Sequence, residues 1–173
     1  MRLFLAILLS SIFFMQSCQK KDNSKKNTIK KTAMSIAVTH TRAKKLNNYS
    51  IKEIKKWKEY FIVEDFIHQL DKTTPTEALN NAIELKTLSK HLKDSLNVKD
   101  LMIPSFKARI HVFENEVLRL ADMTYIPSIS ATDVNNQVEK VLTIFSSLNA
   151  KINTLYDKKR FDSEINIDSI FNQ

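Results

Sequence analysis

The sequence predicts an all-α protein, folded as an antiparallel, left-handed, up-down bundle of four helices. Three observations support this prediction. Apolar residues recur every three or four positions over long stretches, which is the period of an amphipathic helix. Helix-start signals and prolines separate these stretches. The 173-residue chain contains no glycine, and because tight hairpin turns favour glycine, a sheet-based fold is disfavoured.

The first predicted helix covers residues 50–70. It opens on Ser50-Ile51-Lys52-Glu53, which has the form of a capping box. We expect its apolar side to pack into the bundle. That side consists of Ile51, Ile54, Trp57, Phe61, Ile67 and Leu70.

The second predicted helix follows Thr74-Pro75-Thr76-Glu77, a start signal with proline in the first helical position, and runs to about residue 96. Since glycine is absent, we expect asparagine in left-handed positions, with Asn97 at the C-terminal cap of this helix. The residues expected to face inward are Leu79, Ile83, Leu85, Leu88 and Leu92.

The third helix is predicted to begin at Pro104, and the fourth at Ser130 or Thr132. Their apolar residues alternate spacings of four and three, and this near-heptad pattern favours a left-handed bundle. Asn149 lies beside the fourth stripe, where a buried polar residue would fix the register. The two stripes are Phe106, Ile110, Phe113, Val117 and Leu120, and Val134, Val138, Val141, Phe145, Leu148, Ile152 and Leu155.

Residues 1–17 have the layout of a secretory signal peptide. Arg2 is followed by an apolar run over residues 3–15, and the small Ser17 precedes the expected cleavage site. The run is shorter than the ~20 apolar residues of a spanning helix. The alternative is a short membrane anchor that is never cleaved.

Cys18, the only cysteine, follows this run directly. The segment Met15-Gln16-Ser17-Cys18 resembles the lipobox of bacterial lipoproteins, in the looser form found in Bacteroidota. The resemblance implies cleavage before Cys18, lipid attached to Cys18, and a place in the bacterial cell envelope. The alternative is an incidental thiol, and with one cysteine no intramolecular disulfide can form.

Residues 18–49 are predicted to be a basic, mostly flexible tether. Residues 19–49 contain nine Lys or Arg and one acid, Asp22, whereas residues 50–173 contain 17 basic and 18 acidic residues. A nucleic-acid-binding domain would carry its charge excess on a folded face, so we expect no nucleic-acid partner. Basic residues beside a lipid anchor are attracted to anionic headgroups instead. A short helix over residues 29–43 is the alternative for part of this segment.

The lysines after Cys18 also bear on location. Surface-displayed lipoproteins of Bacteroidota tend to have acidic residues in this place. Because the chain differs from that pattern, we expect a periplasm-facing protein. The outer membrane is the first choice for its location, and the inner membrane is the alternative. The lysines concerned are Lys20, Lys21, Lys25 and Lys26.

Helical bundles often bind metals between facing helices. Here the spacing offers Asp65 with His68, His91, and His111 with Glu114. None of these residues lies clearly on an apolar stripe, and solvated helix faces produce such pairs by chance. We therefore expect no metal and no cofactor.

The third helix carries Arg109, Glu116 and Arg119 beside its apolar stripe, seven and three residues apart. This row is a candidate for recognising acidic groups of a partner, and Trp57 is a candidate aromatic contact. The alternative for the charged row is an ion-pair ladder along the edge of the helix.

These observations divide the chain into a signal peptide (1–17), a tether (18–49), a helical domain (50–160) and a tail (161–173). No serine stands in a nucleophile-elbow motif, and Cys18 is assigned to lipid. We therefore expect a non-catalytic module that binds another envelope protein. The alternatives are a metal- or ligand-binding bundle and a small envelope enzyme.

Overall fold

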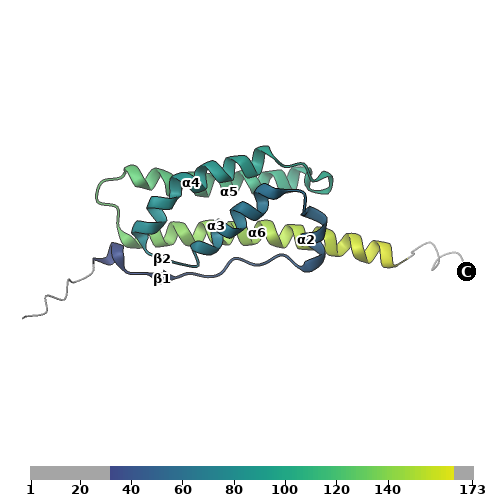
Figure 1. The fold of residues 1–173 in the computed structure, drawn as a ribbon, viewed down its shortest axis with the longest axis horizontal. Coiled ribbons are helices and arrows are strands. Elements are labelled where there is room, and N and C mark those ends of the chain that lie inside the picture. Colours follow the sequence, from purple (N-terminus) through teal and green to yellow (C-terminus); the bar gives the residue numbers. More distant parts are fainter. Residues whose placement is uncertain (1–31, 166–173) are drawn as a thin grey trace, which may run out of the picture. The chain divides into compact units, whose positions relative to one another are not determined.

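The computed structural model describes residues 32–165, and this part of the chain is predominantly helical, as predicted (Figure 1). No helix among these residues is long and apolar enough to cross a membrane. The predicted signal peptide, Cys18, the first part of the tether and residues 166–173 lie outside the described residues. The helices are α2 (Asn48–Ile54), α3 (Lys58–Gln69), α4 (Pro75–Asp94), α5 (Pro104–Asp122) and α6 (Ala131–Glu164), with 3-10 turns η2 (Ala33–Ser35), η3 (Lys99–Leu101) and η4 (Met123–Tyr125).

Successive long helices pack against each other. α3 contacts α4, α4 contacts α5, and α5 contacts α6. α2 and α4 also contact α6, which is the longest helix and runs along the whole domain (Figure 1). A single apolar core lies between them, and its largest side chains are Trp57, Tyr60, Tyr156, Phe106, Phe113 and Phe145.

Three of the predicted helix starts are confirmed. Thr74 and Glu77 form a complete capping box at the start of α4, with Pro75 in the first turn. Pro104 occupies the first turn of α5. The Ser130 side chain accepts a hydrogen bond from the backbone N–H of Asp133 and caps α6.

The single helix predicted over residues 50–70 is wrong, because the structure divides it into α2 and α3. The N-cap of α2 is Asn47, whose Oδ1 accepts a hydrogen bond from the Ser50 N–H at 2.7 Å, so Ser50 does not start the helix. The break lies at Trp57, which has non-helical backbone angles. It lets the indole turn inward, where its N–H donates to Ser95 Oγ at 3.1 Å. Packing of one aromatic residue therefore overrides the helical periodicity.

The apolar stripes of α5 and α6 are confirmed, apart from Leu155, which is only partly buried. The stripe predicted for α4 is partly wrong. Ile83 is 43% exposed, and Leu79 and Leu88 are half-buried. Small residues take the inner positions because α4 lies close to its neighbours. The buried residues of α4 include Ala78, Ala82, Leu85, Ser89 and Leu92.

The structure also contains a two-stranded antiparallel ladder that the all-α prediction did not include. β1 (Val38–Thr39) pairs with β2 (Lys72–Thr73), with Val38 opposite Thr73 and Thr39 opposite Lys72. Within the described part of residues 29–43, the alternative of a short helix is wrong, because only the three residues of η2 are helical.

Residues 36–47, which we call the strap, are not the flexible tether that the sequence predicted. The strap runs in extended form along the domain (Figure 1), and His40, Ala43 and Leu46 are buried. The folded domain therefore begins well before residue 50. At the other terminus, α6 continues through residues 161–164, which we had assigned to the tail.

The expectation of a left-handed asparagine is also wrong. Among residues 32–165, it is Ser128 and not an asparagine that has a positive φ angle (61°). Ser128 follows Pro127 in the link between η4 and α6. α4 ends at Asp94 with Ser95 as its C-cap, so Asn97 does not cap it.

Candidate functional site

A row of polar side chains on α6 binds the backbone of the strap. Glu139 Oε1 accepts from the Thr41 N–H at 3.1 Å, and Ser146 Oγ accepts from the Lys44 N–H at 2.9 Å. Backbone groups of an extended segment need hydrogen-bond partners when they leave water. Here helix side chains supply partners that a neighbouring strand supplies in a sheet.

Two asparagines of α6 also bind the backbone of the strap. Asn149 Nδ2 donates to the Lys44 carbonyl at 2.6 Å. Asn153 Nδ2 donates to the Lys45 carbonyl at 3.0 Å, while its Oδ1 accepts from the Asn47 N–H at 2.9 Å. An amide side chain offers both a donor and an acceptor, which suits it to an extended backbone.

His40 lies at the start of this row. Its side chain is 1% exposed, and its Nδ1 lies 3.0 Å from Glu139 Oε1, the same oxygen that binds Thr41. The His40 backbone N–H donates to the Asp71 carbonyl at 2.9 Å, which ties the strap to the turn after α3. One carboxylate of α6 thus positions both a buried ring and the backbone next to it.

Asn149 connects the strap to the aromatic core. The Tyr60 hydroxyl, on α3, lies 2.9 Å from Asn149 Oδ1 and 3.1 Å from Glu64 Oε1. Burial, with Glu64 nearby, holds the pKa of Tyr60 well above its usual range. The prediction that Asn149 is a buried polar residue is confirmed, but what it contacts is the strap and α3.

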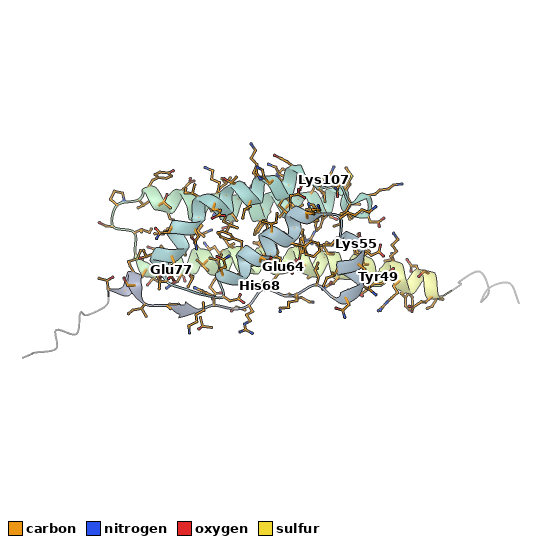
Figure 2. All side chains as sticks on the ribbon, in the orientation of Figure 1. Tyr49, Lys55, Glu64, His68, Glu77 and Lys107 are labelled. Atoms are coloured by element: carbon orange, nitrogen blue, oxygen red, sulfur yellow. The ribbon has the colours of Figure 1, made fainter. Side chains whose placement is uncertain are left out.

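The predicted metal candidates do not come together. His68, labelled on α3 in Figure 2, has its Nδ1 3.6 Å from an oxygen of Asp71. His111 Nδ1, on α5, lies 3.9 Å from an oxygen of Glu114. Asp65 and His91 are exposed. Within residues 32–165 there is no group of three or more His, Cys, Asp or Glu placed to hold a metal ion.

Trp57 does not form part of a partner-binding surface, because it is 1% exposed and packs against Tyr60 and Phe106. It is a core residue. The prediction treated it as an accessible aromatic contact because a stripe position alone does not say how deeply a side chain is buried.

The charged row on α5 is divided among local contacts. Arg109 donates to the Ser105 carbonyl at 2.7 Å, and Arg119 lies 3.8 Å from Glu116. Gln137 of α6 donates to both the backbone and the carboxylate of Glu116, at 2.8 and 2.9 Å. Glu116 therefore joins α5 to α6, while the Arg119 side chain stays 65% exposed.

A small hollow of about 170 Å³ lies where α4 ends and α5 begins. Met102 beside it is 48% exposed, and Lys107 and His111 are exposed on the same side; Figure 2 labels Lys107. Lys93 is bound to both oxygens of Glu114 at 2.8 Å, and this hydrogen bond raises the pKa of Lys93. The residues lining the hollow are Lys93, Leu96, Met102, Lys107, Ile110 and His111.

Sequence reasoning found Asn149 but missed the rest of the strap-binding row. A signal was present, because the polar residues of α6 that bind the strap recur at helical spacing beside the apolar stripe. They lie on a second face of the helix. Those residues are Glu139, Ser146, Asn149, Asn153 and Asp157.

Comparison with known proteins gives no relative: no family model, no curated protein and no solved structure matches the chain.

Proposed function

We propose that the chain is a lipid-anchored envelope protein, held by Cys18 in the outer membrane with its helical domain facing the periplasm. The position of Cys18 after an apolar run and before a lysine-rich segment carries this proposal. The strap adds support, because the segment that continues the tether is hydrogen-bonded to the longest helix. A pull on the anchor is thereby distributed over α6.

The role of the domain, in this proposal, is non-catalytic binding of another envelope protein. The hollow between α4 and α5 is the best candidate for the contact surface. It combines the half-exposed Met102 with the cationic Lys107, so it suits a partner that presents an apolar side chain next to an acid.

We further infer that α3, α4, α5 and α6 form the left-handed, up-down arrangement of a four-helix bundle. Contacts between successive helices and the near-heptad stripes of α5 and α6 support this finer description. The hollow then lies at the α4–α5 hairpin, at one end of the bundle.

The anchor is tested by intact mass measurement and membrane fractionation of the chain expressed in a bacterium with the lipoprotein pathway. We expect a mature chain that begins at residue 18, carries acyl groups and stays with membranes after an alkaline wash. The Cys18→Ser variant should carry no acyl groups. A chain that keeps residues 1–17, or a Cys18→Ser variant that still carries acyl groups, would overturn the anchor.

The partner is tested by site-specific photo-crosslinking in the native envelope. A crosslinker at position 102 should give one discrete adduct, and Lys107→Glu in the same chain should abolish it because it reverses the charge beside the hollow. A crosslinker at position 51 on α2, where Ile51 is 37% exposed, is the matched control. The same adduct from both positions would show that the α4–α5 surface is not selective.

A further inference from the structure

One end of the described domain gathers several exposed apolar side chains. η2 and η4 both contact α4 there, and a shallow hollow of about 400 Å³ lies between the three elements. Met34, Ile83 and Thr124 line it, and the Thr76 hydroxyl donates to the Met34 carbonyl at 2.9 Å, which holds η2 against α4.

Large apolar side chains of α4, of η4 and of the residues that follow η2 and η4 are exposed. Tyr125 is 74% exposed, Ile126 and Ile36 are each 50% exposed, and Ile83 is 43% exposed. With the half-buried Met34 they form what we call the apolar patch. Exposed apolar groups gathered in this way mark a surface that something covers.

Two of the three segments that build this end, those around η2 and η4, carry no charge. Residues 32–39 and 123–132 contain no Asp, Glu, Lys or Arg. The acids nearest along the second segment, Asp122 and Asp133, stand just outside it. A surface that approaches lipid must avoid charged groups, since their desolvation is costly, and tyrosine is enriched where headgroups meet acyl chains.

The chain also enters the domain at this end. Thr32 precedes η2, and 13 residues stand between Cys18 and Thr32, so the two are at most about 50 Å apart when this segment is fully extended. Lys30 and Lys31 come directly before Thr32 and favour anionic headgroups. A short basic tether that joins the domain beside these exposed apolar residues brings that end toward the lipid surface.

We propose that the apolar patch contacts the surface of the membrane that holds the anchor, with Tyr125 and Ile126 at headgroup level. This inference rests on the lipid anchor proposed above. In this arrangement one end of the domain faces the membrane, because η2 and η4 lie at the end of the domain where α6 begins (Figure 1). The α4–α5 hollow then points away from the bilayer. Exposed acids of α4, Glu77 and Glu84, restrict the contact to the headgroup region.

The test uses the lipidated chain in vesicles of phosphatidylethanolamine and phosphatidylglycerol. Since lipid would occupy the only native thiol, Tyr125→Cys introduces a single reactive thiol for a polarity-sensitive fluorophore. Lipids brominated near the headgroup should remove most of its fluorescence. Phe161→Cys is the matched control, an aromatic residue 57% exposed near the end of α6, and its label should keep its fluorescence.

Equal quenching at positions 125 and 161, whether strong or absent, would overturn the proposal. A second result would also overturn it. If neither aqueous iodide nor brominated lipid quenches the label at position 125 in native membranes, a protein and not lipid covers the patch. Two labels on each Tyr125→Cys chain would instead show that Cys18 is a free thiol. That result is a failure of the anchor itself and is read from the mass of the labelled chain.

A second measurement avoids the label. This measurement uses residues 18–173 with Cys18→Ser. The double change Tyr125→Ser and Ile126→Ser should weaken partitioning into the same vesicles by about tenfold or more, because each change removes a large apolar side chain that the membrane would otherwise bury. Ile62→Ser on α3, where Ile62 is 51% exposed, should leave partitioning unchanged. Equal effects of the two changes would overturn the proposal.

Discussion

Ser128 holds a left-handed backbone conformation (φ 61°) in the turn that leads into α6. Pro127 comes before it, and this order fits a type II turn, in which the residue after proline needs a positive φ angle and glycine is preferred. The chain has no glycine, so a residue with a β-carbon takes the position at a steric cost of about 1–2 kcal/mol.

Ser128→Gly should therefore stabilise the domain. The expected gain in the free energy of unfolding is roughly 0.5–1 kcal/mol, because the relief of strain exceeds the entropy that glycine adds to the unfolded chain. Urea denaturation measures it. Ser128→Ala keeps the β-carbon and is the control, which should give no gain. If alanine stabilises as much as glycine, backbone strain is not the cause.

Asn149 is 1% exposed and joins three elements through two hydrogen bonds, to the Lys44 carbonyl and the Tyr60 hydroxyl. Asn149→Ala leaves the Lys44 carbonyl without this donor, whereas the Tyr60 hydroxyl keeps its contact with Glu64. We expect a loss of about 1–3 kcal/mol, the cost of one buried group left unsatisfied. Asn136→Ala, at an exposed position of the same helix, should change the denaturation midpoint little. Similar losses at the two positions would contradict this role.

Ionisation of Tyr156 should lower the stability of the domain at alkaline pH. Burial, with Asp100 and Glu53 nearby, raises the pKa of Tyr156 to about 12, whereas an unfolded tyrosine ionises near pH 10. The unfolded chain therefore loses this proton first, and stability present below pH 10 is lost as the pH rises toward 12. Tyr156→Phe should flatten the fall of the urea midpoint between pH 10 and 12. An unchanged slope would show that the fall has another source.

At the scale of elements, the sequence predicted correctly which residues of the long helices form an apolar stripe and where those helices begin. The five stripe residues of α5 are all buried, and the caps at Thr74 and Ser130 are present. It predicted Asn149 as a buried polar residue beside the stripe on α6 but missed Asn153, which is also buried. A helix covered on a second face by an extended segment keeps polar residues there to bind the backbone. Hydropathy alone reads such residues as solvent-exposed.

The same limit explains the error at Trp57 and in the tether. No local sequence rule predicts that the Trp57 indole N–H donates a hydrogen bond to Ser95, 38 residues later, or that the helix is interrupted at Trp57. Likewise, Ala43 and Leu46 are too few to predict a helix or strand by period. They are ordered because α6 supplies both an apolar surface and hydrogen-bond partners 102–108 residues away. These are tertiary effects, and the periodicity of one segment does not contain them.

The strap should detach locally when Asn153 is changed. Asn153→Ala removes the partners of the Asn47 N–H and the Lys45 carbonyl. Trypsin should then cut native chain after Lys44 and Lys45 several times faster, because a local opening that costs 1.4 kcal/mol less is tenfold more populated. Cleavage sites are identified by mass spectrometry. Asn115→Ala, exposed on α5, is the control. Cleavage that speeds up equally at lysines outside the strap would indicate global unfolding instead.

At the scale of the whole molecule, the strap decides where the domain begins. A division at residue 50, as the sequence predicted, would remove Ala43 and Leu46 from the core and the backbone partners from a row of α6 side chains. The strap is also the segment that continues toward Cys18. In the anchoring proposed above, this one element therefore completes the fold and connects the domain to Cys18.

A chain beginning at Thr32 should consequently fold like the chain of residues 18–173, whereas a chain beginning at Ser50 should not. Burying Leu46 contributes about 1.5–3 kcal/mol, and the hydrogen bonds between strap and α6 contribute roughly 0.5–1.5 kcal/mol each. Together they reach about 5 kcal/mol, which is comparable to the whole stability of many domains. Circular dichroism and urea denaturation should show a cooperative transition for the longer chain and a weak or absent one for the shorter. Adding a synthetic peptide of residues 32–49 to the shorter chain should restore part of the transition, since the strap binds through contacts that α6 presents to it. Two chains of equal stability would mean that the strap lies on a domain that is already complete without it.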